Sequence, residues 1–502
     1  MSSTSANQGR KPWIMNAFAM AAPGHLAPGK SNESGRVNIS VSDRKYQGLW
    51  RHPSQEKPTL DHWVRLAKYL DENGFHGIFF ADVLGLYDVY KDGNPALQSG
   101  SQVPILDVSL LVSAMAHATK NLSFVITAST TYDNPYSLAR KFATLDHITN
   151  GRVGWNIVTT FMESAAKSYG LEQGIEHDER YRIADEFLEV VYKLLEGSWQ
   201  DSAVEADKQT GVWTNPDKVR KINHVGLVEL PALVLHRCML TLPSKYFKCA
   251  GPSIVDPSPQ RTPFLLQAGA SKAGKDFAAK HAEAMFLPGM VPKKTAQVVQ
   301  ETRSLLRELG KPEDSVKFIS GIFIVVDETD EKAQAKFNDL LQYADLEGTA
   351  SLFGGWTGTD LSKLSDDEDS AFNPKAPAIQ SMINSWTESV PGTAGLKWTK
   401  KLVLENLAIS GAHPRAIGSP TTVANILQQW VDEAGVDGFN LSYATTPGTF
   451  EDLVKYLWPE LRKRGVLQGS YAGSSMRENY LQDGQGPRVR EWHPASEYTW
   501  RD

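Results

Sequence analysis

The segment GRVGWNIVTT (Gly151–Thr160) places Trp155 and Asn156 side by side in a run of strand-forming residues. An indole and a primary amide each need a hydrogen-bond partner when they are buried. One strand can carry both if it belongs to a parallel barrel, because its first half is then buried and its second half reaches the ligand site. The kind of sheet that contains this segment therefore decides the fold.

Seven further apolar runs have the length of a strand, and helical or mixed segments separate them. The helical pattern is clearest after His177, where apolar residues recur at 3.6-residue spacing between Ile183 and Leu194. Alternating strands and helices imply a parallel sheet. Eight strands, with no glycine-rich dinucleotide motif after the first, favour a closed (β/α)₈ TIM barrel over an open sheet. The predicted strands are Trp13–Phe18, Gly77–Asp82, Leu122–Ser129, Arg152–Thr159, Pro263–Gly269, Ala282–Leu287, Val316–Val326 and Gly438–Tyr443.

We predict one barrel domain over residues 13–469, preceded by a disordered N-terminus (1–12) and followed by a polar surface tail (470–502). Two segments are longer than a barrel requires. Residues 198–262 separate the fourth helix from the fifth strand, and residues 341–418 separate the seventh strand from the eighth. Because loops near the carboxyl ends of barrel strands surround the ligand site, we expect the second insert to act as a lid.

The composition excludes several classes of protein. Hydrophobic residues make up 41% and charged residues 22% of the chain, and the formal net charge is −6, which argues against a nucleic-acid or anionic-membrane partner. Cys238 and Cys249 lack zinc-site spacing, and the histidines form no HExxH or HxH motif, so we predict no metal site. With neither a signal peptide nor a membrane-spanning apolar run, the sequence predicts a cytoplasmic protein.

Polar residues recur at the predicted carboxyl ends of the strands. A single one more often closes the following loop, but several around one rim predict a binding site. In QAGASKAG (267–274) a strand leads into a helix that begins near Ser271, which is either an anion site or an ordinary helix cap. His177 and Tyr181 share one helical face, a spacing that more often gives a packed surface contact. The strand-end residues are Asp82, Thr127, Ser129, Asn156–Thr160, Gln267 and Asn440.

Four long motifs occur in a fixed order: FFADVLGLYDVY (79–90), ITASTTYDNPYSLARKFATLDHITNGRVGWNIVTT (126–160), HDERYRIADEF (177–187) and QAGASKAG (267–274). Together they resemble the nitrilotriacetate monooxygenase component A and dibenzothiophene-sulfone monooxygenase family, within the bacterial-luciferase-like flavin monooxygenase superfamily. The resemblance extends from about Trp13 to about Leu467. Several long motifs in the right order are far more specific than any one of them.

The resemblance implies a (β/α)₈ barrel that receives reduced FMN from a separate NAD(P)H:FMN oxidoreductase. It would use O₂ to oxygenate a small organic substrate of the nitrilotriacetate, sulfone or related xenobiotic type, as a homo-oligomer. Carried over residue by residue, the cofactor-binding positions are Asp82, Thr127, His177, Tyr181 and Ser271. We add the hypothesis that Asn156 has a catalytic role, holding the isoalloxazine edge or the peroxide.

Two other functions stay open at this point. A barrel hydrolase would pair Asp82 with Glu163 or Asp178, and a non-catalytic flavin-binding paralogue would keep the fold without the reaction. If the substrate is a carboxylate, cationic rim residues would suit it, and four arginines are available. They are Arg51, Arg140, Arg152 and Arg180.

Residues 227–244 depart from the family pattern, in which the flanking segments follow one another almost directly. The insert is rich in Leu, Val and Pro. A surface loop of this composition would expose an unusual amount of apolar surface to water. We hypothesise that it is translated intron sequence; the competing interpretation is a real loop over the site or at a subunit contact.

The intron hypothesis predicts that mass spectrometry of the native protein finds no peptide from Leu227–Ser244, while peptides on both flanks are detected. A peptide that spans this segment would establish the insert as a genuine part of the protein.

Overall fold

Eight parallel strands close into a barrel in this computed structural model, which describes residues 11–29, 49–226, 246–289, 291–364, 382–384, 387 and 395–501. Neighbours in the barrel follow chain order, and the last strand pairs with the first. All eight predicted strands are confirmed. They are β1 (Ile14–Met20), β2 (Gly77–Ala81), β3 (Ser123–Ser129), β4 (Val153–Val158), β9 (Phe264–Ala268), β10 (Ala284–Leu287), β11 (Lys317–Val326) and β13 (Gly438–Ser442).

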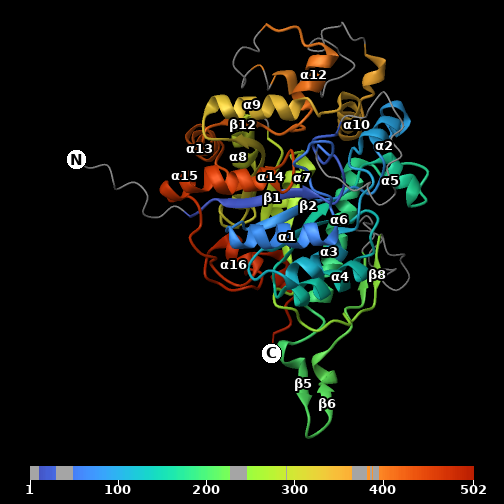
Figure 1. Cartoon of the computed structure of the whole chain (residues 1–502). Coiled ribbons are helices and arrows are strands. Elements are labelled where there is room, and N and C mark those ends of the chain that lie inside the picture. Colours follow the sequence, from blue (N-terminus) through green and yellow to red (C-terminus); the bar gives the residue numbers. More distant parts are fainter. Residues whose placement is uncertain are drawn as a thin grey trace.

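Helices surround the barrel (Figure 1). The longer ones that follow the strands are α1 (Leu60–Glu72), α3 (Val108–His117), α4 (Pro135–Thr149), α6 (His177–Leu195), α7 (Lys272–His281), α8 (Pro292–Glu308), α9 (Asp330–Leu341) and α13 (Pro420–Gln429). Shorter ones are α2 (Asn94–Ser99), α5 (Glu163–Ser168), α14 (Gly448–Asp452) and α15 (Trp458–Lys463). None of the described helices is long and apolar enough to cross a membrane.

Strand β4 can accommodate both Trp155 and Asn156 because successive side chains of a strand point to opposite faces of the sheet. Trp155 points outward, where its ring lies 5.3 Å from that of Phe142 on α4, and its indole N–H donates to the Ala128 carbonyl at 3.1 Å. Gly154 faces the barrel interior, since a Cβ there would lie 2.6 Å from the Met476 sulfur. Asn156, two residues further on, therefore faces the interior as well.

The second insert contributes α10 (Leu346–Thr357), α12 (Lys400–Leu407) and β12 (Arg415–Gly418). The sequence did not predict β12, which extends the sheet beside the carboxyl half of β11. Helix α10 packs closely on the segments that follow β2, because glycines face them: a Cβ on Gly355 would lie 1.9 Å from the Tyr87 ring. Figure 1 shows α10 beside α2, and the function of the insert as a lid stays a prediction.

The first insert follows helix α6 and so leaves from the amino-terminal end of the barrel. It forms two antiparallel hairpins, one from β5 (Val204–Asp207) and β6 (Val212–Thr214) and one from β7 (His224–Val225) and β8 (Lys248–Cys249). The first hairpin projects away from the body (Figure 1). The anomalous segment 227–244 lies outside the described residues. Its flanks meet, since the Gly226 N–H donates to the Phe247 carbonyl at 3.1 Å.

The expectation of a polar surface tail after residue 469 is wrong for helix α16 (Met476–Leu481). A capping box between Ser475 and Glu478 starts this helix, and its Met476 and Tyr480 side chains enter the amino-terminal end of the barrel. There the Tyr480 hydroxyl donates to Asn16 of β1 at 2.6 Å. The sequence of this segment predicted exposure because most of its residues are polar, but several of these polar side chains form hydrogen bonds inside the protein.

One buried ion pair fixes α16 to the barrel. Arg477 donates to both carboxylate oxygens of Glu283, at 2.7 and 2.8 Å, and both side chains are 0% exposed. The same guanidinium also donates to the carbonyls of Thr262 and Pro263. Removal of one partner would leave the other charge buried without compensation.

We predict that Arg477→Met lowers the free energy of unfolding by about 3–5 kcal/mol, measured by urea denaturation. The control is Arg65→Met, which removes an ion pair with Glu56 from an Arg65 side chain that is 63% exposed. That change should cost only about 0–1 kcal/mol. Equal losses in the two variants would contradict the structural role of the tail.

Candidate functional site

Three of the predicted site residues come together near the carboxyl ends of β2, β3 and β4. Thr127 lies within β3 rather than after it, and it is in register with Asn156 on β4. The Thr127 hydroxyl donates to the Phe80 carbonyl of β2 at 2.8 Å and accepts from the Asn156 amide at 2.8 Å. Asp82 follows β2 directly. This first group thus ties three neighbouring strands together at one rim.

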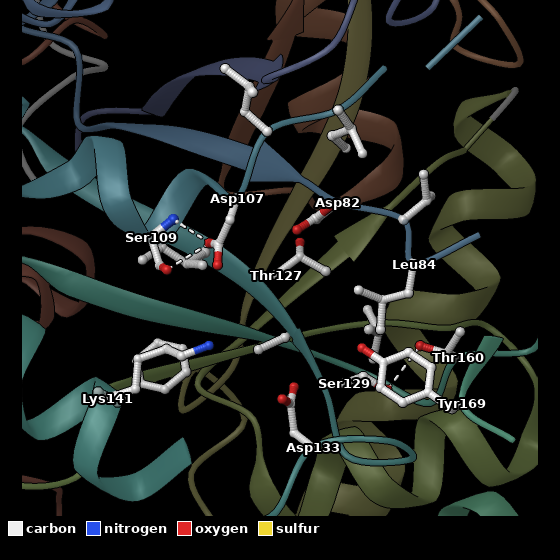
Figure 2. Close-up of a pocket in the computed structure, with 17 residues that line it drawn as sticks. Asp82, Leu84, Asp107, Ser109, Thr127, Ser129, Asp133, Lys141, Thr160 and Tyr169 are labelled. Atoms are coloured by element: carbon white, nitrogen blue, oxygen red, sulfur yellow. Dashed lines mark hydrogen bonds between the residues drawn. The ribbon is translucent and has the colours of Figure 1, made fainter. Parts of the chain in front are cut away.

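Asp82 and Thr127 line a pocket of ≈ 240 Å³ between the strand ends and helices α3 and α4 (Figure 2). Two further carboxylates, Asp107 and Asp133, line it together with the amine of Lys141. These residues come from four separate loops and helices, and no pattern in the sequence predicts that they would meet. The pocket combines three acidic groups with one basic group and an apolar floor that includes Phe142.

The pocket changes the acidity of Asp82. Burial raises its pKa from 3.8 to about 7, and the negative charges of Asp107 and Asp133 act in the same direction. The Val83 N–H and Lys141 offset part of this rise. Near neutral pH the Asp82 carboxyl is therefore divided between its protonated and ionised forms, so it can donate as well as accept a hydrogen bond.

The other three predicted residues gather at the amino terminus of α7. Ser271 caps this helix by accepting from the Gly274 N–H at 3.1 Å. The Tyr181 hydroxyl lies over the same turn, since a Cβ built on Gly269 or on Gly274 would be 3.0 Å from it. The His177 and Tyr181 ring centroids are 5.3 Å apart. Backbone N–H groups, hydroxyls and the positive end of a helix form an anion-binding set.

The two groups lie on neighbouring strands. Strands β2, β3, β4 and β9 are consecutive neighbours in the barrel. Asn156 on β4 is in register with Leu266 on β9, which lies eight residues before Gly274 of α7. Both groups therefore occupy adjacent strands of one rim. His177 is at the outer edge, where it is exposed and its ring nitrogen contacts Asp178 at 2.7 Å. The second group does not line the pocket of Figure 2.

Buried polar atoms without partners mark the same rim. Among the described residues, Asn156 Oδ1, Gln267 Oε1 and Arg180 Nε are buried and have no hydrogen-bond partner. Each such atom costs about 1–3 kcal/mol when nothing satisfies it. These three atoms lie at the ends of β4 and β9 and at the start of α6, where a polar ligand could supply their hydrogen-bond partners.

Below the rim, the barrel interior is aromatic and uncharged. The Phe18 ring lies 4.7 Å from His25, 5.2 Å from Phe286 and 5.4 Å from His413, between ring centroids. Burial lowers the pKa of His25 to about 3 and that of His413 to about 4, so both rings are neutral at pH 7. Gly321 of β11 leaves the space that His413 fills, since a Cβ there would lie 2.6 Å from its ring.

A chain of hydrogen bonds fastens α10 over this interior. The Trp356 indole of α10 donates to the Tyr87 hydroxyl at 3.2 Å, and that hydroxyl donates to Gln102 at 2.9 Å. The Gln102 amide in turn donates to the His25 carbonyl at 2.7 Å. The insert is thus connected to the loops that follow β1 and β2. Sequence reasoning missed these four residues, because only the fold brings them together.

Arg152 and Arg140 do not contribute to a cationic rim, whereas Arg180 lies at the polar rim described above, where its Nε has no partner among the described residues. Arg152 lies at the amino-terminal end of β4 and donates to the carbonyls of Ala116 and Leu122. Arg140 is exposed on α4, and Arg180 donates to the Thr159 carbonyl at 2.7 Å.

The carboxylate pairs of a hydrolase are not formed either. Glu163 accepts from the Gly174 N–H, and Asp178 contacts His177, so neither lines the Asp82 pocket. Within the described part of the chain, no three His, Cys, Asp or Glu side chains are grouped as metal ligands.

Comparison with known proteins gives a consistent result. A family model for luciferase-like monooxygenases matches residues 38–438. A dimethyl-sulfide monooxygenase of Hyphomicrobium sulfonivorans is 40% identical over 97% of this chain and 94% of its own. A long-chain alkane monooxygenase of Geobacillus thermodenitrificans is 38% identical (96% and 97% covered), and nitrilotriacetate monooxygenase component A of Aminobacter aminovorans is 30% identical (86% and 93%). The crystal structure of DmoA from Hyphomicrobium sulfonivorans has a TM-score of 0.85, with 97% of this chain and 96% of that chain covered.

The raised pKa of Asp82 predicts a pH-dependent contribution to stability. The folded protein keeps this proton up to about pH 7, while the unfolded chain releases it near pH 3.8, so the stabilising contribution is lost as the pH rises through about 7. Urea denaturation should therefore show wild type losing stability relative to Asp82→Asn between pH 5 and 8. The exposed Asp88→Asn is the control. A stability difference between wild type and Asp82→Asn that does not change with pH would contradict this assignment.

Proposed function

This chain belongs to the luciferase-like monooxygenase family of flavin-dependent enzymes, and we propose that it is the oxygenase of a two-component system. In this proposal it takes up reduced FMN from a separate NAD(P)H:FMN oxidoreductase and uses O₂ to oxygenate a small organic substrate. The relative named as component A of nitrilotriacetate monooxygenase supports a separate reductase. The observation that carries the proposal is the convergence of an anion-binding turn and orphaned polar groups on adjacent strands of one barrel rim.

The turn between β9 and α7 fits the phosphate of FMN. The free N–H groups at the start of α7 favour an anion, and the Ser271 and Tyr181 hydroxyls can donate to it. Gly269 and Gly274 keep this turn open, because a Cβ on either would lie 3.0 Å from the Tyr181 hydroxyl. His177, one turn before Tyr181 on α6, would add a donor from the outer edge.

The first group fits the ring end of the cofactor. Asp82, Thr127 and Asn156 present one carboxyl, one hydroxyl and one amide beside the phosphate turn. When bound, reduced FMN supplies the electrons and the activation of O₂. The protein orients it and keeps water away, and helix α10, fixed through Trp356 and Tyr87, closes one side of the site.

The interior favours an uncharged, apolar substrate. It contains phenylalanine rings and two neutral histidines, and the buried Arg152 donates to backbone carbonyls instead of facing it. A carboxylate placed there would lack a cationic partner, which costs several kcal/mol. The relatives named for dimethyl sulfide and long-chain alkanes support the same class of substrate.

Flavin binding tests the phosphate assignment. Ser271→Ala and Tyr181→Phe should each weaken FMN binding by about ten- to a hundredfold, since a hydrogen bond to a charged group contributes about 1.5–3 kcal/mol. Quenching of flavin fluorescence measures this affinity. Tyr456→Phe is the matched control, since that hydroxyl accepts from Lys455 on the exposed surface. Unchanged affinity in both site variants would rule out this phosphate site.

A substrate panel tests the proposed substrate class. With a generic flavin reductase, catalase and FMN, we expect oxygenated products from dialkyl sulfides or n-alkanes at rates at least about a hundredfold above those from nitrilotriacetate, because burying an unpaired carboxylate costs several kcal/mol. Product has to be measured directly, since uncoupled flavin oxidation also consumes NADH. Preferential turnover of the tricarboxylate would contradict the proposed substrate class.

A further inference from the structure

The indole of Trp356, near the end of α10, packs against two separate groups of side chains. One is the cluster of the barrel interior, which includes Phe18 and Phe286. The other surrounds Tyr87 in the segment that follows β2. Among the described residues, no other side chain is shared by these two clusters. Trp356 is therefore the residue through which this helix reaches the barrel interior.

The indole is held at both of its ends. At one end its Nε1 donates to the Tyr87 hydroxyl at 3.2 Å. At the other end its Cη2 faces Gly411, where an added Cβ would lie 2.9 Å from Cη2 and 3.3 Å from Leu26 Cδ2. Gly411 has a φ of +56°, a backbone conformation that favours glycine, and it lies in the turn after α12. Two segments that are distant in sequence thus fix the position of the ring.

These contacts place the indole over one side of the barrel mouth. Tyr87 follows β2 and Leu26 follows β1, while the segment from Gly411 leads to His413, which fills the space beside Gly321 of β11. Strands β2, β1, β13 and β11 are consecutive neighbours, whereas the proposed cofactor groups extend from β2 the other way round the barrel, through β3 and β4 to β9. A substrate that meets the flavin from the interior therefore lies between those groups and the indole.

The strand ends beside the interior carry small side chains. Ala81 ends β2 and Ala268 ends β9, and both pack against the interior cluster. Trp356 packs against the same cluster and is far larger than either alanine. Closely packed side chains resist the insertion of additional methylene groups. A substrate chain that lengthens toward the mouth would therefore meet the indole, because the ring is fixed at both ends.

The function proposed above leaves the size of the substrate open. On the basis of that function, we propose that Trp356 is a specificity-determining residue, whose indole sets the largest apolar substrate that the site accepts. The site then takes short dialkyl sulfides or alkanes of a few carbons and excludes longer chains. Tyr87 and Gly411 act on this limit indirectly, since they hold the indole in place.

The test varies the length of the substrate and the residue at position 356. Methyl n-alkyl sulfides, from dimethyl sulfide to hexyl methyl sulfide, are supplied with FMN, a generic flavin reductase and catalase, and kcat/KM is taken from product measured by gas chromatography. Affinities for the same sulfides are measured by calorimetry with oxidised FMN present, so that no turnover occurs. Trp356→Ala removes the indole, and Trp356→Phe keeps an aromatic ring but removes the donor to Tyr87.

Phe353→Leu is the matched control. Phe353 lies on the same helix as Trp356 but packs in a different cluster, which includes Val403 and Leu407 of α12. Its replacement loosens the packing of the insert without removing bulk from the barrel mouth.

We expect wild type to favour dimethyl sulfide, with kcat/KM at least about tenfold lower for hexyl methyl sulfide. In Trp356→Ala the ratio of the hexyl to the dimethyl substrate should rise about a hundredfold, in kcat/KM and in affinity, because each CH₂ that becomes buried contributes about fourfold. Trp356→Phe and Phe353→Leu should stay within about fourfold of the wild-type ratio, the contribution of one CH₂.

Three results would overturn the proposal: a Trp356→Ala variant in which all chain lengths change equally, a Phe353→Leu variant that shifts the ratio as far as Trp356→Ala does, or a wild type that prefers hexyl methyl sulfide. A wild type that neither binds nor oxygenates any of these sulfides would refute the proposed substrate class, and the size limit would fail with it.

Discussion

The close approach of β1 and β13 is the contact on which the rest of the barrel depends. A Cβ on Gly438 would lie 2.1 Å from the Ile14 carbonyl oxygen, so only glycine lets the last strand pair with the first. Once that pair forms, eight parallel strands lie in chain order and all their carboxyl ends meet at one rim. Asp82 and Ser271, which are distant in sequence, follow β2 and β9 and therefore lie at this same rim.

The rim and the interior below it have different chemical characters. The rim holds hydrogen-bonding groups from β2, β3, β4 and β9, several of them unsatisfied. The interior holds packed aromatic rings and two histidines that burial keeps neutral. The proposed polar cofactor above an apolar interior would fit this division, since the flavin needs fixed donors and acceptors while its reaction needs protection from water.

The sequence predicted those features that depend on a local pattern of residues. Apolar runs located all eight strands, and QAGASKAG predicted a helix that begins near Ser271, the residue that caps α7. It could not predict groups that form only in three dimensions, such as the Asp107 and Asp133 side chains that raise the pKa of Asp82. Nor could it show that Arg477 pairs with Glu283 inside the protein, and the tail that contains it was therefore misjudged as a surface segment. Five of the six site residues were chosen by resemblance, and Asn156 was chosen by its position at a strand end. The structure places them in two neighbouring groups of three, and their roles remain proposals.

The most direct test of the account is a crystal structure of this chain with FMN bound. We predict the phosphate within hydrogen-bonding distance of the Ser271 and Tyr181 hydroxyls at the start of α7, with the isoalloxazine extending across the ends of β4 and β3 toward Asp82. Flavin bound elsewhere on the barrel, or a ring directed away from Asn156 and Thr127, would contradict it.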